Sequence, residues 1–185
     1  MSTPPWETES DHLLTETAIF ELRQRRARSA LDPNLEGDFV YLRSPGWVNV
    51  IAITEAGELV FVEQFRHGSQ EVTIEIPGGM VDPGEDYVTA GTRELLEETG
   101  YAGDPAVLIG EVSPNPAIQD NRCGTVLILN AQKVSSQATD SHEEIHVSRW
   151  HERELPGLVR SKLITHALVI AAFHHLHLWR AGEAG

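Results

Sequence analysis

The chain has 185 residues, 41% of them hydrophobic, which suits one globular domain with a substantial core. Its formal net charge of −14 argues against nucleic-acid binding, because phosphate contacts need clustered lysine and arginine side chains. Bound cations can reverse a local field, so this charge does not exclude an anionic small-molecule substrate. Cys123 is the only cysteine, which excludes an intrachain disulfide and fits a cytoplasmic protein in which Cys123 is a small core residue.

The N-terminal part of the chain predicts strands after a mobile start. Residues 1–15 are polar and contain proline, so we expect a mobile lead-in. The start of the chain has no basic segment and no apolar run, so we expect no signal peptide. In the segment 17–29 a basic run follows Ile19 and Phe20; we expect a strand here and a turn over 31–37. Further strands, divided by Ser-Pro-Gly and Glu-Ala-Gly turns, are predicted at 39–43, 48–54, 59–65 and 72–76.

The remainder of the chain predicts two helices with strands between them. The first helix should begin just after Glu85 or Asp86 and end at Gly100, a residue suited to the left-handed conformation that closes a helix. Strands are predicted at 107–112, 125–130 and 145–150. A final long helix is expected over 158–180, with a buried face formed by Ile164, Leu168, Ala171 and Ala172. This order of elements indicates a mixed sheet covered by helices on both faces.

The last predicted helix contains a cluster of histidines. They interrupt the apolar stretch 163–179, which we therefore interpret as a buried helix and not as a membrane span. A metal site is the alternative interpretation, but no carboxylate or cysteine lies close to them in the sequence. We favour surface or interface histidines on an amphipathic helix. The cluster consists of His166, His174, His175 and His177.

The helix that ends at Gly100 carries three glutamates on one side. At about 100° per residue, Glu94, Glu97 and Glu98 share one arc, and a neighbouring arc holds packing residues. Like charges at these spacings repel each other unless a cation lies between them. Magnesium and manganese ions prefer oxygen ligands, so the pattern indicates a divalent-cation site. The packing residues are Val88, Gly91, Thr92 and Leu95.

The segment 79–101 resembles the Nudix box, G-x5-E-x7-R-E-U-x-E-E-x-G-U, where U is a bulky aliphatic residue. Only Tyr101, in the last U position, departs from the pattern. The segments Gln64-Phe65-Arg66 and Glu75-Ile76-Pro77-Gly78-Gly79, with Pro116, are similar to the ADP-ribose pyrophosphatase-like branch of the Nudix hydrolases. The matching box residues are Gly79, Glu85, Arg93, Glu94, Leu95, Glu97, Glu98 and Gly100.

The resemblance implies a Nudix-type α/β/α sandwich with a mixed β-sheet and an N-terminal β-extension. Residues 1–37 would form the extension and residues 38–185 the hydrolase domain. Relatives of this branch are dimers whose N-terminal strands help to build the partner's site, so the resemblance also implies a homodimer in which residues 19–28 take part.

The resemblance also implies a cation site with two or three magnesium ions, or manganese in their place. Glu94 and Glu98 would be metal ligands, together with the carbonyl of Gly78, and Glu97 would be a supporting ligand. Glu85 would be the partner of Arg93, fixing the preceding loop against the helix.

The general base is expected in the acidic loop before the strand at 145–150. The resemblance places Glu143 at a position that reaches metal or water in relatives, while Ser141 occupies the position that is often the base. Glu144 and Asp140 remain alternatives, and Glu97 is the candidate if the base lies outside this loop.

Substrate contacts follow from the resemblance and from side-chain chemistry. Arg66 matches the family arginine that contacts the diphosphate, a task suited to a planar guanidinium, and Gly79 and Pro116 would line the same site. Arg43 is a weaker candidate and can equally form a surface salt bridge. Trp47 can stack on a base but fits better as a core residue. The loop after residue 112 offers Asn115, Gln119 and Asn121 as hydrogen-bonding candidates.

The implied activity is magnesium-dependent cleavage of ADP-ribose or a similar nucleoside diphosphate sugar, giving a nucleoside monophosphate and a sugar phosphate. Alternatives are hydrolysis of a dinucleotide or of another nucleoside diphosphate hexose, and a sensor with a Nudix fold that has lost catalysis. The intact box argues against the sensor. No nucleic-acid or membrane partner is expected.

Overall fold

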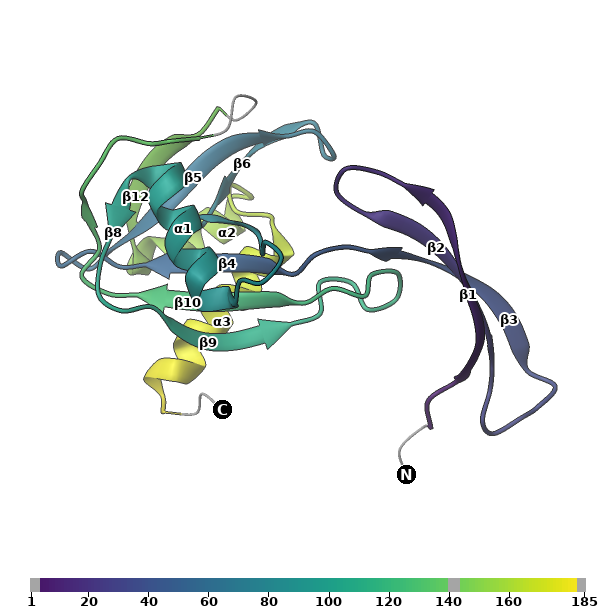
Figure 1. The fold of residues 1–185 in the computed structure, drawn as a ribbon. Helices are drawn as coiled ribbons and strands as arrows, with labels where there is room; N and C mark the ends of the chain where they lie inside the picture. The colour runs from purple at the N-terminus through teal and green to yellow at the C-terminus, as the bar shows by residue number, and fades with distance from the viewer. Residues whose placement is uncertain (1–3, 140–143, 183–185) are drawn as a thin grey trace. The chain divides into compact units, whose positions relative to one another are not determined.

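The structure is a computed structural model that describes residues 4–139 and 144–182. The chain divides into two compact units (Figure 1). The first, called here the N-terminal unit, comprises Met1–Pro45 and Ser113–Arg122, and the second, called the sandwich unit, comprises Gly46–Val112 and Cys123–Gly185. The domain boundary expected after residue 37 stays a prediction.

The N-terminal unit is an antiparallel sheet with the strand order β1 (Glu7–Glu16), β2 (Glu21–Arg28) and β3 (Glu36–Arg43). The mobile lead-in predicted for residues 1–15 is wrong, because β1 begins at Glu7. The acidic composition of this segment is typical of a solvated tail, which is why the strand was not predicted. In the structure these acidic side chains form ion pairs with arginines of β2. The Ser113–Arg122 loop is joined to β3 by backbone hydrogen bonds from Leu42 N to Ile118 O (2.7 Å) and from Asp120 N to Leu42 O (3.1 Å).

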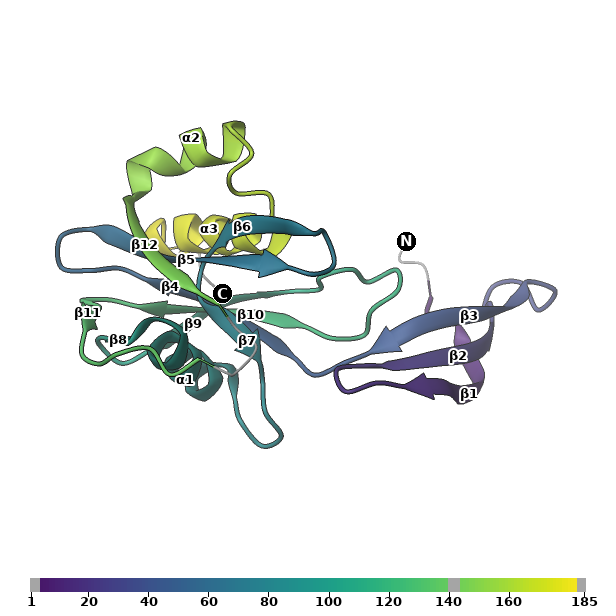
Figure 2. The same ribbon diagram turned by 90° about the horizontal axis from the view of Figure 1, so that it is seen from above.

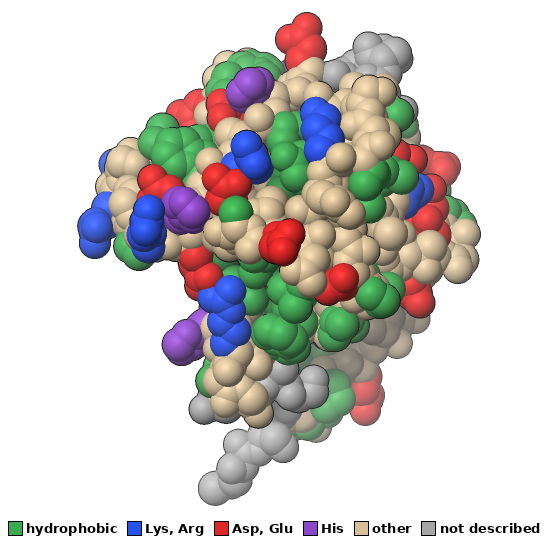
Figure 3. Space-filling view, turned by 90° about the vertical axis from the view of Figure 1, so that its left-hand side faces the viewer, with side chains coloured by type: hydrophobic (Ala, Val, Ile, Leu, Met, Phe, Trp, Pro, Cys, Tyr) green, Lys and Arg blue, Asp and Glu red, His purple; other side chains and the backbone are tan. Residues whose placement is uncertain are grey.

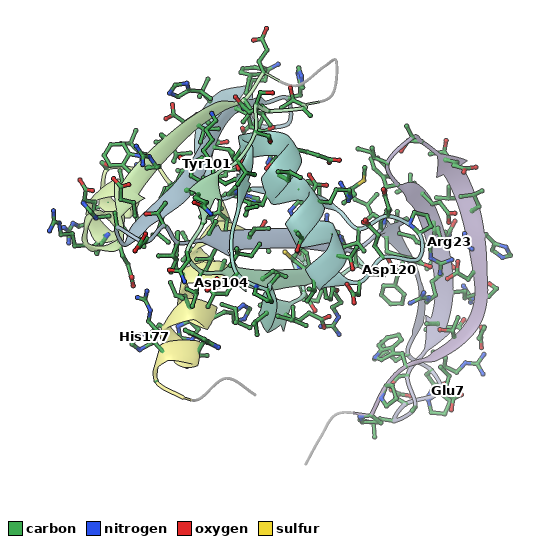
Figure 4. The ribbon with its side chains drawn as sticks, turned by 60° about the vertical axis from the view of Figure 1, so that its left-hand side comes forward. Glu7, Arg23, Tyr101, Asp104, Asp120 and His177 are labelled. Carbon is green, nitrogen blue, oxygen red and sulfur yellow. The ribbon has the colours of Figure 1, made fainter. Side chains whose placement is uncertain are left out.

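Asp11 of β1 is the centre of this pairing. Its carboxylate accepts hydrogen bonds from Arg23 Nε (2.6 Å), Arg25 Nη2 (3.1 Å) and the Tyr41 hydroxyl (2.7 Å). Arg23 is labelled in Figure 4. The hydrogen bonds from Tyr41 and Arg23 hold the pKa of Asp11 well below its usual range. A sheet of three strands therefore gains stability from charged cross-strand pairs as well as from apolar contacts.

The sandwich unit contains a four-stranded mixed sheet in the order β7-β4-β10-β9 and a three-stranded antiparallel sheet in the order β12-β5-β6. β4 runs parallel to β10, and the other neighbours in the mixed sheet are antiparallel. β8 and β11 form a separate short pair. The strands are β4 (Trp47–Ala52), β5 (Glu58–Arg66), β6 (Glu71–Glu75), β7 (Gly78–Met80), β8 (Tyr101–Ala102), β9 (Val107–Val112), β10 (Cys123–Ile128), β11 (Gln132–Lys133) and β12 (His146–His151).

Helices cover both faces of the mixed sheet (Figure 2). α1 (Tyr87–Thr99) packs on one face, and α2 (Leu155–Arg160) and α3 (Ala167–Arg180) lie on the other, after a short 3-10 turn at Glu152–Glu154. Successive residues of β4 point to opposite faces, so Val50 joins the core under α1 while Ile51 joins the core under α3. The predicted α/β sandwich with an N-terminal β-extension is confirmed.

The prediction of one final helix over 158–180 is wrong. α2 ends at Arg160, and Lys162 takes a left-handed conformation with a φ of 61°. The turn brings Ile164 into the core, 1% exposed, before α3 begins. The face of α3 that is buried consists of Val169, Ala172 and Leu176, while Leu168 and Ala171 are only half-buried.

Two histidines of the cluster are exposed, and the other two, His166 and His175, are half-buried. His174 and His177 are exposed, as expected, and their rings stack with centroids 6.4 Å apart; Figure 4 labels His177. His175 is half-buried over Gly110, with Nδ1 2.9 Å from Thr125 Oγ1. Cys123 is a buried core residue, as expected, and burial raises the pKa of its thiol to about 12.

Within the described part of the chain, no helix combines the length and the apolar composition needed to cross a membrane.

Candidate active site

α1 has the two ends predicted from the sequence. The Asp86 side chain accepts a hydrogen bond from Thr89 N (2.8 Å) at the N-terminal end, and Gly100 closes the helix with a φ of 72°. Gly91 and Leu95 are buried as expected, but Thr92 is exposed and donates its hydroxyl hydrogen bond to Val88 O (2.8 Å). The helix is therefore anchored at both ends, which fixes the direction of its acidic side.

Tyr101, the one departure from the box pattern, is 8% exposed and belongs to the core under α1 (Figure 4). It therefore takes the packing role of the aliphatic residue that the pattern specifies.

The Arg93 guanidinium donates hydrogen bonds to several carboxylates of the box. Its Nε and Nη2 donate to the two oxygens of Glu85 (3.1 and 2.9 Å), and its Nη1 donates to Glu94 (2.9 Å) and Glu97 (3.1 Å). Nη2 also donates to Met80 O at 3.1 Å, which ties β7 to the helix. The hydrogen bonds from Arg93 hold the pKa of Glu85 below its usual value. The fork between Arg93 and Glu85 thus attaches the loop before the helix to the helix itself, in the pairing expected from the resemblance.

Gly78 and Gly79 let the glutamates approach the backbone of β7. Gly78 N donates to Glu98 Oε2 at 2.9 Å, and the Glu98 side chain is buried. A Cβ at Gly79 would lie 2.2 Å from Glu94 Oε1, and a Cβ at Gly78 would lie 2.2 Å from Val48 O. Any larger residue at either position would push the backbone or a carboxylate away.

These residues line a pocket of about 390 Å³. Its charged lining consists of four carboxylates and two guanidinium groups, so negative charge predominates. Trp47 forms part of the wall, and its Nε1 donates to Asn49 Oδ1 at 3.1 Å. Trp47 is therefore half-buried with access to the pocket, and not a fully enclosed core residue. The charged lining residues are Arg66, Asp82, Arg93, Glu94, Glu97 and Glu98.

The donor chemistry of the pocket fits a hard divalent cation. Glu94 and Glu98 offer carboxylate oxygens beside the backbone of Gly78 and Gly79, and magnesium prefers such ligands. In the side-chain positions observed, the Arg93 guanidinium lies between Glu94 and Glu97. Among the described residues, no three His, Cys, Asp or Glu side chains are grouped for metal binding in these positions.

Arg66 reaches the pocket from the end of β5. Its Nε and Nη2 each donate to Glu75 at 2.8 Å, a two-point contact that fixes the plane of the guanidinium. The sequence indicated Arg66 but not its buried partner, although Glu75 stood in the quoted Glu-Ile-Pro-Gly-Gly segment.

The loop after β11 borders the pocket from another side. Gln137 Nε2 donates to Glu98 O (2.7 Å) and Ile145 O (3.1 Å), and Ala138 N donates to Glu97 O (2.8 Å). Ala138 and Thr139 are part of the pocket lining. Gln137 was not among the residues predicted for the site, because its contacts are with backbone carbonyls that only the fold brings near.

Among the candidates for the general base, Glu143 and Asp140 lie outside the described residues, as does Ser141. Glu144 is described and exposed, and Glu97 lines the pocket.

Arg43 and Pro116 belong to the N-terminal unit. Arg43 Nε donates to Asp120 (3.2 Å) and Arg43 Nη2 donates to the Tyr41 hydroxyl (3.1 Å), so the surface salt bridge considered as its alternative role is present. Pro116 lines a separate pocket of about 360 Å³ with aromatic residues of the same unit, Trp6, Phe39 and Tyr41. Their contacts with substrate stay predictions, as do those of Asn115, Gln119 and Asn121.

Comparison with known proteins is consistent with this site. The family model described as NUDIX domain matches residues 44–172, so the chain belongs to the Nudix family. It is 29% identical over 147 residues to an ADP-ribose pyrophosphatase of Bacillus subtilis, covering 77% of this chain and 78% of that protein. It is also 30% identical over 141 residues to a methanol dehydrogenase activator of Bacillus methanolicus, covering 76% of each.

Similarity of fold extends over nearly the whole chain. A crystal structure of an ADP compounds hydrolase superposes with a TM-score of 0.85 at 18% identity, covering 99% of this chain and 98% of the other. The resemblance to the ADP-ribose pyrophosphatase-like branch is thereby confirmed, and the chain is a Nudix pyrophosphohydrolase.

Proposed function

We propose that this protein is a magnesium-dependent hydrolase that cleaves the diphosphate linkage of ADP-ribose or a similar nucleoside diphosphate sugar. The products would be a nucleoside monophosphate and a sugar phosphate. The observation that carries the proposal is one pocket in which box carboxylates and Arg66 meet. The similarity to an ADP-ribose pyrophosphatase supports the choice of substrate.

We assign the residues of the pocket to cation binding and to substrate binding. Glu94, Glu98 and the Gly78 carbonyl would hold the cations, with Glu97 in support; two or three magnesium ions are proposed, with manganese as the substitute. When bound, such ions neutralise phosphate oxygens and activate water for attack. Arg66 would bind the diphosphate through its planar guanidinium.

Arg93 keeps the box loop in register with α1, so that Gly79 can line the phosphate site. For the general base we propose Glu143, with Glu97 as the alternative inside the described pocket.

We also propose that the protein is a homodimer in which the N-terminal unit contributes to the partner's site, with Arg43 and Pro116 among the substrate contacts. Apolar side chains are exposed on this unit, including Leu13, Leu14 and Phe39. Nucleic acid is not proposed as a partner. On the face shown in Figure 3 acidic and basic side chains are interspersed, and the net charge of the chain is −14.

The test is a panel of nucleoside diphosphate derivatives, scored by phosphate release after coupling to a phosphatase. We expect the highest kcat/KM with ADP-ribose in magnesium, and loss of turnover in a chelator. A dinucleotide or a nucleoside diphosphate hexose as the best substrate would correct the substrate assignment. Binding of ADP-ribose without turnover in magnesium or manganese would instead favour a sensor.

A further inference from the structure

Glu75, at the end of β6, is a buried carboxylate shared by three side chains. It is 3% exposed. Arg66 donates to both of its oxygens at 2.8 Å, and the Thr73 hydroxyl donates to Oε1 at 2.7 Å. The Nδ1 atom of His166 lies 2.8 Å from Oε2. Each carboxylate oxygen therefore has two neighbouring hydrogen-bonding groups.

The surroundings of Glu75 favour its charged form. Burial by itself raises the pKa of this carboxyl, but the hydrogen bonds from Arg66, His166 and Thr73 outweigh that effect and hold the pKa well below the usual value. A buried anion depends on all its hydrogen-bonding partners, because an unsatisfied oxygen in the interior is costly.

His166 comes from a distant part of the chain. It is the residue before α3, and its side chain makes no capping hydrogen bond to that helix. The preceding segment contacts β6 through a hydrogen bond from Ile74 N to Leu163 O (3.4 Å). The start of α3 is thus held beside Glu75, and Glu75 in turn holds Arg66 at the pocket.

We propose that His166 is a positioning residue for Arg66, acting through Glu75, in the binding of the substrate's diphosphate. This inference rests on the proposed function of Arg66. A diphosphate that enters the pocket attracts the same guanidinium that Glu75 holds. Arg66 keeps its orientation only if the carboxylate stays in place, and Thr73 and His166 hold it there through Oε1 and Oε2. The contact with the diphosphate exists before and during the reaction, so its weakening raises KM more than it lowers kcat.

The experiment compares His166→Leu, which removes the ring nitrogen at similar size, with His166→Asn, which keeps a donor at the same distance from the backbone. We expect His166→Leu to raise KM for ADP-ribose about threefold to tenfold with kcat within about twofold, and His166→Asn to stay near the wild type. The matched control is His174→Leu on the exposed side of α3, which should change neither constant.

A second comparison uses Arg66→Lys, which keeps the positive charge but loses the two-point hydrogen bonding of the guanidinium. In that background His166→Leu should add less than about twofold to KM, because both residues act on one contact. The affinity for ADP, measured by calorimetry without added metal, provides a readout that needs no turnover. If the wild type prefers another compound of the panel, that result corrects the proposed function, and the same KM ratios are measured with that compound.

The inference is overturned if folded His166→Leu keeps the wild-type KM and ADP affinity. Loss of kcat alone would overturn it too, as would failure of folded His166→Asn to restore KM.

Discussion

Two charged clusters, one in each unit, use the same kinds of side chain in opposite proportions. In the sheet β1-β2-β3, four arginines of β2 form ion pairs with five acidic residues, and the charges nearly balance. In the box, Arg93 is shared by three glutamates while Glu98 is buried nearby. Where the charges balance, the ion pairs stabilise a sheet that has few apolar contacts. Where negative charge is in excess beside a pocket, the cluster is suited to binding cations from solution.

The largest effect is expected from breaking the unbalanced cluster at Glu98. Glu98→Gln removes a proposed metal ligand but keeps an oxygen that can accept from Gly78 N, so the fold should be preserved. We expect kcat to fall by about three orders of magnitude or more, because metal ions bound at such a site would stabilise the charge of the transition state by several kcal/mol. Steady-state kinetics in saturating magnesium checks this. Retention of more than about a tenth of the wild-type kcat would show that Glu98 is not a ligand.

The next effect concerns the proposed general base, Glu143. Glu143→Gln should lower kcat by roughly two to four decades with KM nearly unchanged, because general-base catalysis contributes about that much. Glu144→Gln is the matched control and should cost far less. Equal and small losses in the two variants would assign the base to Glu97.

A smaller effect is expected from removing the balanced cluster. Deletion of residues 1–30 removes β1 and β2 and should give a monomer by light scattering, with KM raised several-fold and kcat changed less. Deletion of residues 1–5, which precede β1, should leave a dimer. A dimer with unchanged kinetics after the longer deletion would contradict the proposed role of the N-terminal unit.

The smallest effect tests the charge balance at Asp11. Its pKa is depressed in the folded state, so the ionised carboxylate stabilises the fold above its unfolded pKa of about 3.9, and this contribution is lost as the pH falls below that value. Asp11→Asn should lower Tm at pH 7 by an amount that shrinks towards pH 3, with kcat unchanged. Asp38→Asn, at a more exposed pair, should lower Tm less. A Tm difference that is constant from pH 7 to pH 3 would contradict this account.

Local signals in the sequence predicted much of the fold and the box. The strand at 107–112 and the ends of α1 were correct because apolar periodicity, Asp86 and Gly100 act within a few residues. The short strands β7, β8 and β11 had no such signal, since two or three residues show no period.

What the sequence by itself determined is the Nudix family, the acidic side of α1 and the pairing of Arg93 with Glu85, all within one short segment. Only the tertiary structure decided that β1 is a strand, that the last helix is broken at Lys162, and that His166 meets Glu75. Two of these outcomes depend on partners outside the local segment: Asp11 pairs with Arg23 of the neighbouring strand, 12 residues away, and His166 is 91 residues from Glu75. A local sequence pattern does not predict these side-chain contacts, because they form when separate segments of the chain pack together.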